Sequence, residues 1–123
     1  MNLSELKTYL HQKAGTTEET PFGPEALVYK VMGKMFALVG HMSDPLTINL
    51  KCDPDDSLAL RDQYESINPG YHMNKKHWNT ITLNGEVPEP EIYDLIDHSY
   101  RLVVNGLRKA QKEELAALST KGN

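Results

Sequence analysis

Apolar residues near the N-terminus follow helical spacing, whereas those further along alternate as in strands. The first pattern predicts a helix that begins between residues 2 and 4 and ends near Lys13, before Gly15. An irregular connection rich in proline and glycine is expected over residues 16–26. The strand pattern therefore begins only at about residue 27.

Three strands are predicted after this connection. Residues 27–32 and 35–40 flank Gly33-Lys34, and two residues led by glycine are a signal for a tight hairpin. Residues 46–52 alternate between apolar and polar, which is typical of an antiparallel sheet with one buried face. Cys52 falls on the apolar side of that alternation.

The second half of the chain predicts two more helices separated by a second hairpin. Asp53 suits the N-cap of the first helix, and helical spacing carries its apolar stripe to Ile67. The hairpin has a short arm at 71–73 and a second arm at 78–83, and the last helix runs from about Pro90 to Asn105-Gly106. The buried face of that helix is expected to comprise Ile92, Leu95, Ile96, Ser99 and Val103.

The order α-βββ-α-ββ-α predicts an α+β domain in which helices pack on an antiparallel sheet. We expect a single domain over residues 1–107 and a polar C-terminal tail over residues 108–123 that is partly helical or frayed. Charged residues make up 24% of the 123-residue chain and hydrophobic residues 39%, which suits a globular protein. We expect no membrane span and no secretory signal, and a lone Cys52 fits a reducing compartment, so the cytoplasm is the expected location.

The net charge of −4 opposes nucleic acid at long range, so DNA binding would need a local basic surface. Residues 66–85 contain no Asp or Glu and include Lys75 and Lys76. Alternation places Trp78, the only tryptophan, on the opposite face of its strand from Ile81 and Leu83. An outward tryptophan beside lysines suits stacking on a base or sugar, or contact with a protein, although polar hairpin tips and core tryptophans are also ordinary architecture.

Metal binding and catalysis fit the same region less well. His72 and His77 lack the i,i+4 spacing of a helical zinc pair, and no nearby cysteine or carboxylate completes a set. Residues 53–56 lack the glycine and distal glutamate of a calcium loop, and helix capping explains them better. A catalytic pair of Cys52 with His72 or His77 is an alternative that spacing does not exclude. We nevertheless expect that the protein is not an enzyme and binds no metal or cofactor.

Four segments together resemble the MmcQ/YjbR family: PFGPEALVYKVMGKMFALV, LKCDP, PGYHMNKKHWNT and LIDHSYRLVVNGL. The resemblance spans residues 21–107 and implies a frataxin-like (CyaY-like) α+β domain described as a double wing, in a family usually called DNA-binding. It implies no catalytic residues. The first helix has only Glu5 among its acids, so the acidic iron-binding ridge that a frataxin likeness would suggest is not supported.

We therefore expect a non-enzymatic protein that binds duplex DNA through the hairpin around residues 70–80. Two lysines give a salt slope of only about 2, so binding by a monomer should be weak unless Lys30, Lys34 and Lys51 contribute. The expected DNA-binding residues are His72, Asn74, Lys75, Lys76, His77, Trp78 and Asn79.

The alternative is a domain that binds a protein or a small ligand and has no nucleic-acid role. A pocket lined by Tyr71, His72 and Trp78 would favour a ligand, whereas a flat basic ridge would favour DNA.

Overall fold

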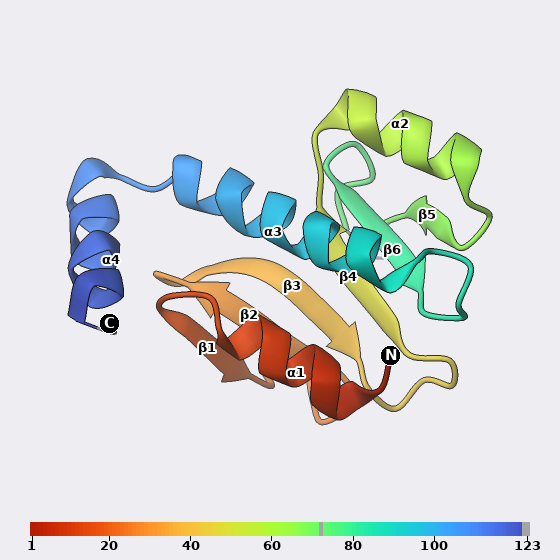
Figure 1. Cartoon of the computed structure of the whole chain (residues 1–123), viewed down its shortest axis with the longest axis horizontal. Coiled ribbons are helices and arrows are strands. Elements are labelled where there is room, and N and C mark those ends of the chain that lie inside the picture. Colours follow the sequence, from red (N-terminus) through yellow and green to blue (C-terminus); the bar gives the residue numbers. More distant parts are fainter. Residues whose placement is uncertain (72, 122–123) are drawn as a thin grey trace.

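The computed structural model describes residues 1–71 and 73–121, which form an α+β domain around a six-stranded antiparallel sheet (Figure 1). The strand order is β1-β2-β3-β4-β6-β5. The elements are α1 (Leu3–His11), β1 (Thr16–Glu19), β2 (Leu27–Val31), β3 (Lys34–Gly40), β4 (Thr47–Lys51), α2 (Pro54–Gln63), β5 (Ile67–Pro69), β6 (Trp78–Thr82), α3 (Glu89–Asn105) and α4 (Lys109–Lys121). The predicted fold class is confirmed.

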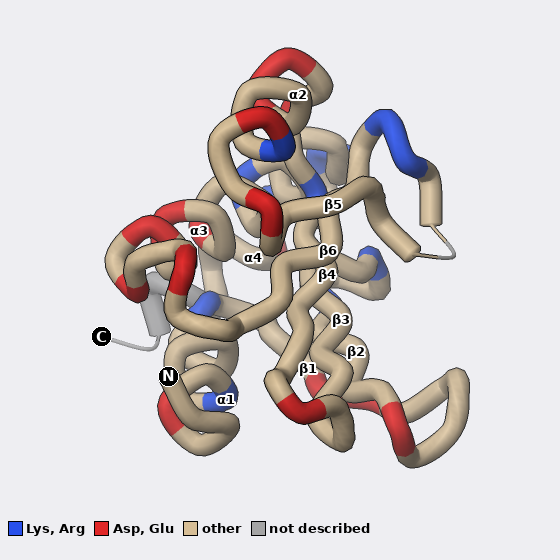
Figure 2. Tube along the Cα trace, turned by 90° about the vertical axis from the view of Figure 1, so that its right-hand side faces the viewer, with Lys and Arg blue, Asp and Glu red and all other residues tan. Residues whose placement is uncertain are grey.

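The two faces of the sheet have different surroundings. Figure 2 views the sheet edge-on, with α1 and α3 on one side and the loops of residues 20–26 and 70–77 projecting from the other. The helix-covered face carries the core, in which one row of side chains runs across five strands in register. This row consists of Leu27, Val39, Ile48, Ile81 and Ile67. We call the opposite side the open face.

Helix α3 is fixed to the sheet by an irregularity in β3. Tyr29 pairs with Ala37 but Lys30 pairs with Met35, so Phe36 is an extra residue in its strand and is buried like Ala37. The hydroxyl of Ser99 on α3 donates to the Phe36 carbonyl at 2.6 Å and accepts from the Lys51 amide at 2.9 Å. Ser99 therefore joins the helix to two strands, and its predicted burial is confirmed.

Several local predictions differ from the structure. The β2–β3 turn is centred on Met32-Gly33 rather than Gly33-Lys34, because the tight turn requires positive φ at both central residues, here 49° and 80°. Residues 16–19 form the edge strand β1 instead of an irregular connection.

The second hairpin begins earlier than predicted. Helix α2 ends at Gln63, because Tyr64 takes an extended conformation, and Ile67 begins strand β5 rather than continuing the helix. The first arm of the hairpin is therefore residues 67–69, and of the predicted arm at 71–73 the described residues Tyr71 and Met73 lie in the loop.

The segment after Leu107, expected to be a polar and partly helical tail, forms helix α4 and adds a side chain to the core. Leu115 of α4 is buried with the main core, and a Cβ added at Gly15 would lie 2.8 Å from its side chain. Helix α4 is thus packed at the turn between α1 and β1. Within the described chain, no helix combines the length and apolarity needed to cross a membrane.

Candidate functional site

The loop of residues 70–77 carries most of the residues that the sequence singled out. Its two lysines, Lys75 and Lys76, are exposed at the tip (Figure 2, blue). The Asn74 side chain accepts from the Lys76 amide at 3.0 Å, and its carbonyl accepts from the amides of His77 and Trp78. Asn74 therefore shapes the turn. The Lys75 ammonium donates to the Gly70 carbonyl at 3.1 Å, so Lys76 is the more open of the two charges. His72 lies outside the described residues.

Asn79 occupies the interior rather than the surface, which differs from its expected role in contacting DNA. It is 2% exposed, and its amide nitrogen donates to the Ser57 hydroxyl at 3.3 Å. Its side-chain oxygen accepts from Arg61 Nε at 2.7 Å. The alternation explains this placement, because Asn79 lies on the same face of β6 as buried Ile81.

Arg61 on α2 connects that helix to the loop, and no sequence pattern pointed to this contact. Besides Asn79, its guanidinium donates to the backbone carbonyls of Lys75 and Trp78. One side chain thereby holds both ends of the segment that carries the lysines. An arginine in the last turn of a helix reads as an ordinary surface residue, so the sequence offered no signal for this contact.

Trp78 lies on the face of β6 that alternation predicts, opposite Ile81, and is half-buried. It pairs with Lys51 and shares a shallow hollow with Lys34 and the end of α3. Gly70 packs directly against it: a Cβ at Gly70 would lie 2.8 Å from the Trp78 Cβ. The tryptophan therefore has two neighbouring cations but a limited exposed surface.

A larger, more enclosed pocket opens on the open face of the sheet. Its volume is about 680 Å³, within the range of small-molecule sites. Four separate parts of the chain contribute: the 20–26 loop, strand β3, residues 43–49 and the β5–β6 hairpin. The pocket is lined by Phe22, Ala26, Met35, Leu38, Ser43, Thr47, Asn49, Tyr71, Met73 and Thr80.

The mouth of this pocket is aromatic. Phe22 is 70% exposed and Tyr71 is 72% exposed, and they reach it from two loops on the same side of the sheet (Figure 2). Exposed apolar side chains that gather around a cavity are typical of ligand-binding grooves. Of the hairpin residues expected to line a ligand pocket, Tyr71 does so, whereas Trp78 lies in the shallow hollow instead.

The floor of the pocket is polar and has a defined hydrogen-bond direction. The Tyr71 amide donates to the Thr80 hydroxyl at 3.0 Å, and that hydroxyl donates to the Asn49 side-chain oxygen. Asn49 is only 6% exposed. Its amide nitrogen has no hydrogen-bond partner among the described residues, so two N–H groups remain available at the pocket floor.

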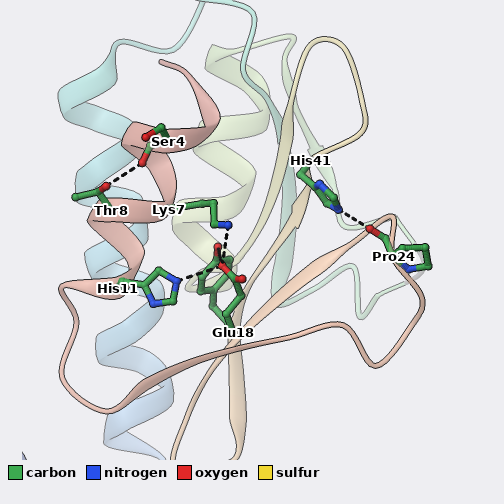
Figure 3. Close-up of polar contacts among 8 residues, drawn as sticks. Ser4, Lys7, Thr8, His11, Glu18, Pro24 and His41 are labelled. Carbon is green, nitrogen blue, oxygen red and sulfur yellow. Dashed lines mark hydrogen bonds and ion pairs between the residues drawn. The ribbon is translucent and has the colours of Figure 1, made fainter.

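The loop that carries Phe22 is anchored at both ends (Figure 3). Just before the loop, Glu18 of β1 accepts a hydrogen bond from the Tyr29 hydroxyl at 2.6 Å. The side chains of Lys7 and His11 on α1 also contact the Glu18 carboxylate. These contacts, the Tyr29 hydrogen bond foremost, hold the pKa of Glu18 below its usual value. At the other end His41 Nε2 donates to the Pro24 carbonyl at 2.5 Å.

Cys52 is poorly suited to act as a nucleophile. Burial raises the pKa of the Cys52 thiol, which keeps it protonated at neutral pH and weakens it as a nucleophile. Within residues 1–71 and 73–121, His, Cys, Asp and Glu form no group of three or more that could hold a metal ion. Cys52 does lie next to the 70–77 loop, since its amide donates to the His77 carbonyl at 2.8 Å.

Comparison with known proteins identifies the family. The model of the YjbR family matches residues 11–102. The chain is 46% identical to the protein named Uncharacterized protein YbdF of Escherichia coli O157:H7 over 95 residues, which cover 77% of this chain and 78% of that one. It is 34% identical to Uncharacterized protein YjbR of Escherichia coli K12 over 118 residues, which cover 96% of this chain and 100% of that one.

Solved structures agree with this assignment. The Deinococcus radiodurans protein DR2400, described as a DUF419 domain, superposes with a TM-score of 0.88 at 40% identity, covering 94% of this chain and 88% of that one. A Pseudomonas syringae protein superposes with a TM-score of 0.71 at 33% identity, covering 83% of this chain and 98% of that one. With its family model matched over most of its length and its fold shared with these relatives, the chain belongs to the YjbR family.

Proposed function

We propose that this protein is a non-enzymatic binding domain that takes a small, mostly apolar molecule in the pocket on its open face. The observation that carries the proposal is the coincidence of an apolar cavity with an aromatic mouth and a polar floor. Small-molecule sites have this composition, in which apolar walls supply affinity and a few polar groups fix orientation. The raised pKa of Cys52 supports a binding role over a nucleophilic one.

The test is a titration with Nile red, a neutral dye whose emission rises in apolar surroundings. We expect saturable binding by the wild type and at least about fivefold weaker binding by Phe22→Ser, which removes one wall of the mouth. Leu58→Ser is the matched control, because Leu58 is 64% exposed on α2 and does not line the pocket. No emission change with the wild type, or equal weakening by both variants, would exclude this pocket as the site.

DNA binding is a second proposal, supported by a different part of the surface. Lys75 and Lys76 are exposed together, and half-buried Trp78 lies with Lys34 and Lys51 in one shallow hollow. A strand of nucleic acid could place phosphates on the lysines and a base or sugar against the tryptophan. The net charge of −4 and the interior position of Asn79 both weigh against tight binding.

Duplex DNA should be titrated at two salt concentrations against the wild type and a Lys75→Glu/Lys76→Glu variant. If the loop binds phosphates, the variant loses binding and the salt slope falls by about 2. A Lys109→Glu/Lys112→Glu variant is the matched control, since both lysines are exposed on α4, away from the loop. Equal affinity for all three proteins would remove this proposal.

A further inference from the structure

We propose that the ligand of the open-face pocket is an uncharged, flat, mostly apolar molecule with one hydrogen-bond acceptor, such as a ring carbonyl, that bonds to the Asn49 amide. This inference rests on the proposed ligand-binding function and specifies its chemistry. Three features of the pocket carry it: the direction of its floor hydrogen bonds, the absence of charge in its described lining, and the shape of its walls.

The floor hydrogen bonds determine which group the ligand presents. A backbone amide can only donate, so the Thr80 hydroxyl oxygen accepts from the Tyr71 N–H. The same hydroxyl donates a hydrogen bond to the Asn49 side-chain oxygen. That arrangement leaves the Asn49 nitrogen as the donor. Asn49 is 6% exposed, and among the described residues its amide nitrogen has no hydrogen-bond partner, so a ligand atom that accepts can take its N–H groups in place of water.

The lining also determines the charge of the ligand. Of the ten described residues that line the pocket, none is Asp, Glu, Lys, Arg or His. A carboxylate or ammonium group placed there would lose its water without gaining an opposite charge, which costs several times more than a hydrogen bond returns. A neutral acceptor satisfies Asn49 without that penalty.

The walls favour a flat ligand. Met35, Leu38 and Met73 give an apolar interior, and methionine side chains adapt to ring edges. Phe22 and Tyr71 at the mouth offer aromatic faces from two different loops. Because Thr80 fixes the backbone of Tyr71 and also orients Asn49, the aromatic mouth and the polar floor form one hydrogen-bonded unit.

The experiment compares three tricyclic probes of nearly the same shape: fluorenone, fluorene and fluorene-9-carboxylate. The first carries a neutral carbonyl, the second lacks it, and the third carries a charge. Binding is followed by chemical shifts of the backbone amides of the labelled wild-type protein. We expect fluorenone to bind about tenfold more tightly than fluorene, and the carboxylate to bind more weakly than either.

Two variants assign the preference to Asn49. Asn49→Leu keeps the size of the side chain and removes the donors, so fluorenone and fluorene should bind equally. Asn49→Asp keeps the acceptor for Thr80 but replaces the donors, so fluorenone should lose its advantage.

The outcomes separate this inference from the proposed function. Binding of all three probes without a preference for fluorenone, or a preference for the carboxylate, overturns the inference and leaves the pocket as a binding site. A preference that survives in both variants also overturns it. If no probe shifts the amides around the pocket and Nile red also fails to bind, the proposed function itself fails.

Discussion

Arg61 is expected to contribute more to stability than a half-exposed helix residue normally does, and Arg61→Ala tests this. Its guanidinium donates to the side chain of Asn79 and to two loop carbonyls, those of Lys75 and Trp78. These acceptors differ in what they would lose. The Lys75 carbonyl lies on an exposed residue and can turn to water, while the Trp78 carbonyl keeps its bond from the Gly70 amide at 2.8 Å.

Only the Asn79 oxygen would be left buried without a partner. An unsatisfied buried acceptor costs about 1–3 kcal/mol, and a hydrogen bond from a charged donor contributes about 1.5–3 kcal/mol. These are two descriptions of the same loss and are not added together. We therefore expect Arg61→Ala to lower the free energy of unfolding by about 2–3 kcal/mol.

The measurement is urea unfolding followed by far-UV circular dichroism and by the emission of Trp78. Arg108→Ala is the matched control, because Arg108 is exposed and should change stability by less than about 0.5 kcal/mol. In an Asn79→Leu background, Arg61→Ala should lower the free energy of unfolding by less than half as much, because the side-chain oxygen that would lose its partner is no longer present. If Arg61→Ala changes stability no more than Arg108→Ala does, the role assigned to this contact is wrong.

Three further substitutions test other contacts. Gly70→Ala should cost about 1–3 kcal/mol and shift the emission of Trp78, because the new Cβ lies 2.8 Å from that side chain; unchanged emission would contradict the close packing. Ser99→Ala should cost about 1–3 kcal/mol in urea unfolding, because it leaves two strand groups without their buried hydroxyl partner, and a neutral result would show that water replaces it. Glu18→Gln should cost about 1–2 kcal/mol at neutral pH, because it weakens the bond from Tyr29. Folding lowers the pKa of Glu18, so its contribution to stability is present above the unfolded value of 4.5 and is lost as pH falls through the folded value. The unfolding free energies of the wild type and Glu18→Gln should therefore converge in acid, and a difference that does not change with pH would contradict this reasoning.

Where side-chain periodicity was strong, the sequence predicted the fold well. The alternation in residues 46–52 became β4, and the proline-led helix start became α2 with Asp53 as its cap. Helix α3 buries Ile92, Ile96, Ser99 and Val103 as expected, whereas Leu95 is only half-buried. Strand β1 could not be found in this way, because its sequence Thr-Thr-Glu-Glu carries no apolar alternation and its pairing with β2 depends on the tertiary structure. Ile67 matched a helical period by coincidence, and only the extended backbone at Tyr64 separates it from α2.

The candidate site was less predictable than the fold. Its loop and the exposure of Lys75 and Lys76 followed from polar composition at a hairpin tip. The open-face pocket did not, since it joins Phe22, Leu38, Asn49 and Tyr71 from four segments that meet only in the folded chain. One signal was present in the sequence, because Asn49 is a polar amide at the centre of a strand, on the face opposite its apolar neighbours. Periodicity alone, however, predicts that such a residue faces solvent.

The two edges of the sheet have a consequence for self-association. An unpaired edge strand is a template on which a second chain can add by backbone hydrogen bonding. Here β5 is three residues long and ends in Pro69, which has no N–H to offer, and β1 is four residues long and ends in Glu18 and Glu19. Short, polar edges with a proline at one side resist strand addition, so concentrated protein should not form the cross-strand aggregates to which longer, apolar edges are prone.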